Sequence, residues 1–363
     1  MAFAPLLLAV SAVLQTGPDI VLPPPTGTQA VGVATYAWID SARVDTLASP
    51  RAFRTVLGRV WYPARRTAAG STAPYAEHLD AAANDWTSLH ARVRTHSYLG
   101  AAFADRTRAP VIVLATGRST ATFDYTTLGE ELASYGYIVV GVDSPHHSKV
   151  VLPDGSLAPI RFPSMGPSTY PNGIDSAQAP MNALVSADLR FVLRRLPSID
   201  RDDSVLRAHL DLDRVGMVGH SNGGMAGSRA CALEPICRTF LGIEGQQTRE
   251  IRFGGVDKPY GLIYSEQTLA FDTARVFTEM RLHARAPFVL YRITGAGHNS
   301  VTDLLLVRPT LFTYPMDPRR GIDVTHGIVR AFFDRNLLGS VAADTVAASF
   351  GEVKVERYGA RPP

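Results

Sequence analysis

The chain has 363 residues, of which 46% are hydrophobic and 19% are charged, and its formal net charge is +3. This balance excludes a disordered or fibrous protein, and the length allows one large α/β domain or two ordinary ones. The basic residues are scattered and are almost all arginine, so nothing indicates nucleic-acid binding. We expect a globular protein with a large apolar core.

The N-terminus divides into an apolar part and a polar part. Residues 4–14, APLLLAVSAVL, form an apolar run that is too short to span a bilayer. Its length and small residues are typical of a secretory signal peptide, although the basic start is missing. We predict a signal peptide over 1–16, a disordered linker over 17–30, and a secreted or periplasmic protein. The alternative is a frayed apolar N-terminus on a cytosolic protein.

The next segments predict the beginning of a sheet and a helix. Two runs between Val31 and Pro63 alternate between apolar and polar residues, which predicts an antiparallel pair of strands. Trp86 to Leu99 has apolar residues at helical spacing. We expect a helix there, either packed on the sheet surface or covering a site.

The following part of the chain predicts a βαβ unit. Residues 109–117, APVIVLATG, and 136–142, GYIVVGV, are apolar runs typical of strands buried in a parallel sheet, and 126–135 has a helical pattern. The motif DSPHHS follows the second strand, at the edge where site residues collect in such sheets. We expect its two histidines, His146 and His147, to lie behind the site or on the surface.

The rest of the chain continues to alternate between helices and strands. Residues 152–180 are rich in Pro, Gly and Ser and predict an excursion over the edge of the sheet. The later elements that we predict are a helix at 181–196, strands at 240–243 and 260–264, a last strand at 287–293, and a helix at 321–338. This order predicts an α/β fold with a mostly parallel sheet, helices on both faces, one catalytic domain over 31–340 and a C-terminal tail over 341–363.

Residues 214–227, RVGMVGHSNGGMAG, combine a strand, a sharp turn and a helix of small residues. Gly219, Ser221 and Gly223 form a G-x-S-x-G motif, in which the glycines leave room where the strand and the helix converge. Such a turn exposes the serine hydroxyl, so Ser221 is the candidate nucleophile. The alternative is an ordinary glycine-rich turn.

A serine nucleophile needs a base within hydrogen-bond reach, and the base needs an anionic partner. His298 follows a strand in the glycine-rich loop TGAGHNS and is the candidate base, whereas His283 and His326 lie in helix-like runs. The acid has two candidates, Glu244 and Glu266, each directly after a strand. The common hydrolase topology, with the chain order Ser, acid, His, favours Glu266.

The oxyanion that forms during acyl transfer needs N–H donors in fixed positions. The candidates are the backbone N–H groups of Asn222, directly after the nucleophile, and of Arg118, in the loop after the strand at 109–117. The sequence contains no phosphate-binding glycine loop, dinucleotide fingerprint or cluster of metal ligands, so we expect no cofactor and no metal.

Cys231 and Cys237 lie six residues apart, beyond the helix that follows the nucleophile. A disulfide fits an exported protein, and two buried thiols fit the sequence equally well, because nothing in it determines the Cα separation. Neither residue is expected to bind a metal, since no histidine or second cysteine pair lies at zinc spacing.

These motifs resemble those of the plasma-type platelet-activating factor acetylhydrolases and their bacterial relatives, within the α/β-hydrolases. The similarity extends from about Tyr36 to Leu338 and rests on RVWYPA, VIVLATG, LGEELASYGYIVVGVDSPHHS, GHSNGG, GIEG, LIYSE and GAGHNS. In that family the acid follows the strand directly after the elbow, which implies Glu244 rather than Glu266. This chain departs from the family in having threonine before the glycine of the oxyanion loop, where histidine is usual, and glutamate where aspartate is usual.

The resemblance implies an α/β-hydrolase fold and a secreted serine esterase with a Ser-His-Glu triad. Such an enzyme releases short acyl groups from the sn-2 position of phospholipids through an acyl-enzyme. We therefore expect a lipid or small ester as substrate, transient contact with a membrane or lipoprotein surface, and no obligate protein partner. The alternatives are a general or cutinase-like carboxylesterase and a non-catalytic binding protein with the same fold.

Overall fold

The computed structural model describes residues 17–48, 50–66, 72–77, 89–104, 108–161, 174–269 and 273–359. The predicted signal peptide over 1–16 lies outside the described residues. Within the described ranges, no helix is both long enough and apolar enough to cross a membrane.

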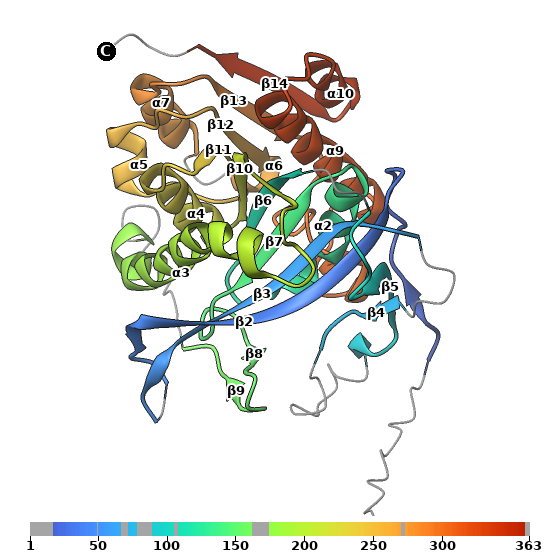
Figure 1. The fold of residues 1–363 in the computed structure, drawn as a ribbon. Coiled ribbons are helices and arrows are strands. Elements are labelled where there is room, and N and C mark those ends of the chain that lie inside the picture. Colours follow the sequence, from blue (N-terminus) through green and yellow to red (C-terminus); the bar gives the residue numbers. More distant parts are fainter. Residues whose placement is uncertain are drawn as a thin grey trace, which may run out of the picture.

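A twelve-stranded mixed sheet runs through the domain (Figure 1). Its strands lie in the spatial order β1-β5-β2-β3-β7-β6-β10-β11-β12-β13-β14, and β4 pairs with β5. Their bounds are β1 Ile20–Val21, β2 Ala30–Asp45, β3 Ala52–Ala64, β4 Thr72–Pro74, β5 Val93–Leu99, β6 Ala109–Ala115, β7 Ile138–Asp143, β10 Leu210–His220, β11 Cys237–Ile243, β12 Tyr260–Ser265, β13 Phe288–Ile293 and β14 Val353–Tyr358. The central strands, from β7 to β13 in this order, are parallel to one another.

Helices cover both faces of the sheet (Figure 1). Their bounds are η2 Thr122–Tyr125, α2 Thr126–Ser134, α3 Ile174–Asp202, α4 Asn222–Leu233, α5 Arg249–Gly254, α6 Glu266–Leu269, α7 Thr273–His283, α8 Leu304–Val307, α9 Pro318–Leu337 and α10 Ala343–Ser349. Helices α3, α4, α5 and α7 contribute to the apolar layer on one face, and α2, α9 and α10 to the layer on the other. The central strands are buried on both sides, which explains their continuous apolar sequences.

A small hairpin stands apart from the main sheet. It consists of β8 (Val150–Val151) and β9 (Leu157–Ala158), which pair antiparallel and project below β2 and β3 in the view of Figure 1. The turn and β9 belong to the excursion predicted over 152–180, of which 162–173 lie outside the described residues, whereas β8 directly precedes it.

The predicted α/β-hydrolase architecture is confirmed, with a mostly parallel sheet and helices on both faces. β2 and β3 form the antiparallel pair predicted between Val31 and Pro63. β6, α2 and β7 form the predicted βαβ unit.

The predicted helix over Trp86–Leu99 is wrong where the structure describes this segment. Val93–Leu99 is the strand β5, which pairs with β1, β2 and β4; 78–88 lie outside the described residues. Alternate side chains of β5 are buried, beginning with Val93. Pairing with strands that are distant in sequence thus overrides a helical spacing of three apolar residues.

Both ends of the domain are more regular than predicted. Residues 17–30, expected as a disordered linker, contain β1, and Thr26 donates hydrogen bonds of 2.7 Å from N and Oγ1 to the Glu131 carboxylate. Residues 341–363, expected as a tail, contain α10 and β14. β14 pairs antiparallel with β13 and corrects the prediction that the sheet ends at 287–293.

Candidate active site

The candidate nucleophile lies in a sharp turn between β10 and α4. Ser221 has φ 53° and ψ −120°, a conformation that L-residues rarely adopt. A Cβ on Gly219 would come within 2.4 Å of the Gly223 carbonyl oxygen, and a Cβ on Gly223 would come within 2.3 Å of the Thr116 carbonyl oxygen. The two glycines are therefore required by close backbone approach, as the motif predicted.

The candidate base contacts the nucleophile directly. His298 lies in the loop after β13, and its Nε2 is 2.9 Å from Ser221 Oγ. Burial lowers the pKa of His298, which keeps the imidazole neutral near pH 7. With its own proton on Nδ1, the ring accepts the serine hydroxyl proton at Nε2.

Glu244 is the acidic side chain that lies beside the base. It follows β11 with φ 53°, and its Oε2 is 3.9 Å from His298 Nδ1. The carboxylate accepts hydrogen bonds from Ser265 N and Thr268 Oγ1. Burial raises the pKa of Glu244 to about 7, against the opposing effect of these hydrogen bonds.

The alternative acid, Glu266, is placed differently. It is the first residue of α6, its side chain is exposed, and its Oε2 accepts a hydrogen bond of 3.3 Å from Gly295 N. The geometry therefore brings together Ser221, His298 and Glu244, and it leaves Glu266 at the rim.

The two candidate oxyanion donors lie on neighbouring backbones. Asn222 is the first residue of α4, where a backbone N–H has no acceptor within the helix. Arg118 lies in the loop after β6, and this loop meets the elbow at the close approach of Gly223 to Thr116. The loop and the helix N-terminus thus border the same space beside Ser221.

A hydrogen-bonded chain that the sequence analysis missed connects the oxyanion loop to the base. Gly117 N donates to Tyr125 Oη (2.9 Å), Tyr125 Oη donates to His220 Nδ1 (2.7 Å), and His220 Nε2 donates to the carbonyl of His298 (2.7 Å). Burial lowers the pKa of His220 to about 3, so the ring is neutral and can both accept and donate. The histidine inside the G-x-S-x-G motif was the available signal, whereas no local pattern distinguished Tyr125.

His147 lies behind the helix N-terminus, one of the two places predicted for it. Its Nε2 donates to Asn222 Oδ1 (2.9 Å), and Asn222 Nδ2 in turn donates to Gln178 Oε1 (2.8 Å) and Asn182 Oδ1 (2.6 Å). Burial lowers the pKa of His147 to about 4. The carbonyl of His147 also accepts from Ser119 N at 3.2 Å, so this residue connects both oxyanion segments.

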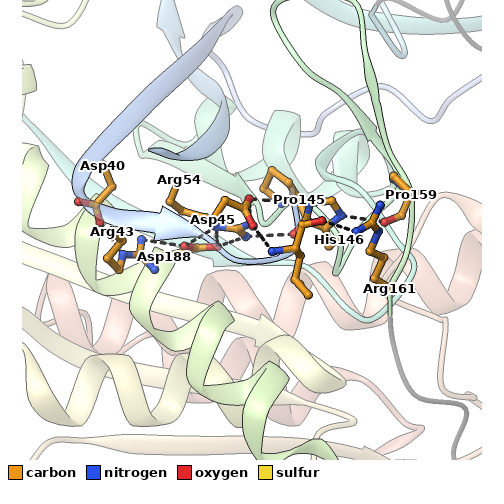
Figure 2. Close-up of polar contacts among 10 residues, drawn as sticks. Asp40, Arg43, Asp45, Arg54, Pro145, His146, Pro159, Arg161 and Asp188 are labelled. Carbon is orange, nitrogen blue, oxygen red and sulfur yellow. Dashed lines mark hydrogen bonds and ion pairs between the residues drawn. The ribbon is translucent and has the colours of Figure 1, made fainter. Parts of the chain in front are cut away.

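His146 belongs to a separate ionic cluster, which is drawn in Figure 2. Its Nδ1 donates to the Pro159 carbonyl (3.0 Å), and its Nε2 is 3.8 Å from Asp45. In the same cluster, Arg54 binds Asp45 at 2.7 Å and Asp188 at 2.6 Å and donates to the Pro145 carbonyl at 3.0 Å. The cluster holds the beginning of the loop that carries His147.

A cavity of about 710 Å³ adjoins the candidate site. Its lining includes Arg118 of the oxyanion loop and Asn299, the neighbour of the candidate base. Apolar side chains from the β8–β9 hairpin and from the loop after α8 form its walls; they include Val150, Leu157 and Phe312. Across the described ranges, no group of three or more His, Cys, Asp or Glu side chains is arranged to hold a metal ion.

The cysteine pair, which the sequence left open, forms a disulfide. Cys231 near the end of α4 and Cys237 at the start of β11 are joined, with a Cα separation of 5.2 Å. The bond connects the helix that follows the nucleophile to the strand that precedes Glu244.

Comparison with known proteins supports the fold. No protein-family model matches the chain, and no curated protein sequence matches it either. Among solved structures, a ferulic acid esterase from Streptomyces cinnamoneus matches with a TM-score of 0.77 and 24% sequence identity, over 92% of this chain and 98% of that chain. The chain therefore has the α/β-hydrolase fold as one domain.

Proposed function

We propose that this protein is a serine carboxylic-ester hydrolase that works through an acyl-enzyme. The observation that carries the proposal is the 2.9 Å contact between His298 Nε2 and Ser221 Oγ at a strained elbow. Glu244 on the other side of the imidazole completes a Ser-His-Glu arrangement. The hydrolase fold shared with a ferulic acid esterase supports the same class of reaction.

In the proposed mechanism, Ser221 Oγ attacks the ester carbonyl carbon while its proton passes to His298 Nε2. Glu244 stabilises the imidazolium, and the backbone N–H groups of Asn222 and Arg118 bind the oxyanion. His298 then gives the proton to the departing alcohol oxygen, which leaves an acyl-serine. A water molecule attacks this acyl group, His298 takes the proton of the water, and the acid leaves as Ser221 is regenerated.

For the substrate we propose esters with short acyl groups, with the sn-2 position of phospholipids as the preferred source. This rests on the motif resemblance to the platelet-activating factor acetylhydrolases, and the cavity beside the site has room for the rest of such a molecule. The proposal includes export of the protein and transient contact with a lipid surface. A general or cutinase-like carboxylesterase is the alternative within the same chemistry.

The test combines labelling and turnover. A fluorophosphonate probe should label Ser221 in the wild type and not in Ser221→Ala, and failure to label the folded wild type would reject the hydrolase. We then compare kcat/KM for a short-sn-2-chain phosphatidylcholine with kcat/KM for 4-nitrophenyl acetate and octanoate. Turnover of the nitrophenyl esters but not of the phospholipid would indicate a general esterase.

A further inference from the structure

Arg59 on β3 is a buried cation that forms no ion pair with any residue that the structure describes. It is 4% exposed, and its hydrogen bond within the described structure runs from Nη2 to the Pro74 carbonyl at 2.8 Å. Its Nε is buried without a hydrogen-bond partner. An arginine stays charged in proteins, and buried charges are normally paired. The Nε–H group of the guanidinium therefore has no hydrogen-bond acceptor within the described structure.

The nearby carboxylates do not satisfy Arg59. Both oxygens of Asp143 accept from Thr122, at 2.8 Å from N and 2.7 Å from Oγ1. Glu77 is half-buried, and its Oε1 makes no hydrogen bond within the described structure. Burial lowers the pKa of Arg59 although these acids oppose the effect. Arg59 thus has the carboxylates of Glu77, Glu130 and Asp143 in its surroundings, but among the described residues it forms no ion pair with any of them.

Arg59 also faces the cavity that begins at the candidate active site. The same cavity is lined by Arg118 and Asn299 at the catalytic end and by the exposed Lys149. Three acids, Glu77, Asp124 and Asp143, line it as well, and burial raises the pKa of Asp124 to about 7 and that of Asp143 to about 6. Near neutral pH the negative charge of Asp124 is therefore reduced.

The walls between these groups determine what else the cavity accepts. Leu57, Val150 and Phe312 are among the residues that line it, so the cavity presents apolar side chains to a ligand beside the polar ones. A guanidinium in such surroundings binds oxyanions well, because it is weakly hydrated and presents parallel N–H donors. The complementary ligand has an apolar body and an anionic end.

We propose that this cavity is a substrate-binding site for esters that carry an oxyanion, either a carboxylate or a phosphodiester, and that Arg59 binds that oxyanion. The inference rests on the proposed hydrolase and specifies its substrate class. A carboxylate would come from the acyl part of a half-ester of a dicarboxylic acid, and a phosphodiester from the alcohol part of a phospholipid. Both present the same chemistry to the guanidinium.

Two pairs of esters distinguish these sources. The acyl pair is 4-nitrophenyl hydrogen glutarate against 4-nitrophenyl valerate, which has a chain of the same length without the second carboxylate. The alcohol pair is 1-alkyl-2-acetylglycerophosphocholine against 1-alkyl-2-acetylglycerol in the same detergent micelles. We expect wild-type kcat/KM to favour the charged member of at least one pair by about tenfold or more.

Arg59→Gln should remove that preference, so that the ratio of the two kcat/KM values falls to about one, whereas Arg59→Lys should retain part of it. The matched control is Arg214→Gln, because Arg214 pairs with Asp211 and does not line the cavity. This control should keep the wild-type ratio. A wild type without preference in either pair, or a preference that survives in folded Arg59→Gln, would overturn the proposal.

Two measurements keep the test independent of variant folding and of turnover. Glutarate should inhibit wild-type hydrolysis of 4-nitrophenyl acetate competitively and more strongly than pentanol does; equal inhibition would count against the site. Calorimetry with Ser221→Ala should show binding of methyl hydrogen glutarate but not of methyl valerate. If the wild type hydrolyses no ester and is not labelled, the proposed function fails, yet this binding result still decides whether the anion site exists.

Discussion

Arg54 and Arg59 lie five residues apart on β3 and are both buried, yet their guanidinium groups have different surroundings. Because five is an odd number, their side chains leave opposite faces of the strand. Arg54 meets two carboxylates and a carbonyl inside the fold (Figure 2). Among the described residues, Arg59 donates to one carbonyl, lies over the Trp61 ring and faces a cavity. Arg54 therefore belongs to a closed ionic cluster, whereas Arg59 has an N–H donor that remains available to a ligand.

The same contrast separates the candidate active site from its supports. Tyr125 and His220 form a continuous chain of hydrogen bonds behind the base. Ser221 and Glu244, in contrast, have positive φ angles. Strained backbone concentrates where chemistry takes place. Variants should therefore divide into those that change activity and those that change stability.

The largest effect should come from Ser221→Ala, which removes the nucleophile of the candidate active site. We expect kcat to fall by about 10⁶-fold. The free energy of unfolding should change by less than about 1 kcal/mol, because the hydroxyl's contact is with the base and not with the core. Ester turnover and calorimetric Tm measured on one preparation check both parts. If Ser221→Ala retains ester turnover, the nucleophile is a different residue.

Next in size is the acid, for which the chain offers a matched pair. Glu244→Gln should lower kcat by about 10⁴-fold, because a neutral amide no longer stabilises the imidazolium. Glu266→Gln should lower it by less than about tenfold, since Glu266 is exposed and accepts its hydrogen bond from Gly295 N rather than from His298. Steady-state kinetics of the two variants decide the assignment, and the reverse order of effects would make Glu266 the acid.

Arg54→Met should break the closed cluster and affect stability more than chemistry. It leaves Asp45 and Asp188 buried without their main partner, which should lower the free energy of unfolding by about 3–5 kcal/mol. Urea denaturation measures this loss. Arg59→Gln should lower the free energy of unfolding by less, because no carboxylate among the described residues would lose an ion-pair partner. Equal losses in the two variants would show that Arg59 is a structural residue like Arg54.

The disulfide should contribute less than the Arg54 cluster. Cys231 and Cys237 close a short loop, so the chain-entropy model assigns the bond about 2 kcal/mol. The double variant Cys231→Ser/Cys237→Ser should lower the free energy of unfolding by that amount in urea denaturation. As a control, dithiothreitol should destabilise the wild type and leave the variant unchanged. If the reductant has no effect on the wild type, the two thiols are not bonded.

The smallest effect concerns the pH dependence of activity. Burial raises the pKa of Glu244 to about 7 and lowers that of His298. As pH falls through about 7, Glu244 gains a proton and no longer stabilises the imidazolium, so kcat/KM should decrease. In Glu244→Gln only His298 remains, and the decrease should move below pH 6.5. A pH–rate profile of both proteins tests the shift, which should be absent if Glu244 is not coupled to the base.

Local patterns were sufficient for the centre of the molecule. Buried parallel strands need continuous apolar runs, so β6 and β7 were evident from composition alone. The elbow was also evident, because close backbone approach at Gly219 and Gly223 excludes any side chain there. His298 was singled out by its position after a strand in a glycine-rich loop, and the structure places it against Ser221.

Local patterns failed near the two ends of the sheet. β5 and β14 depend on pairing with strands far away in the sequence. The choice between Glu244 and Glu266 was also misjudged from the residues, because each follows a strand and the common hydrolase topology favoured Glu266. Only the resemblance to a family favoured Glu244.

The sequence by itself determined the class of fold, the elbow and the residues able to act as nucleophile and base, because each follows from short-range sterics or from periodic burial. Only the tertiary structure decided which carboxylate faces His298, how Tyr125 and His220 support it, and that the cysteines are joined. It also decided that Arg54 is paired with two carboxylates, whereas Arg59 forms no ion pair within the described part of the chain. Burial and charge compensation depend on side chains contributed by many distant segments, and no local pattern contains that information.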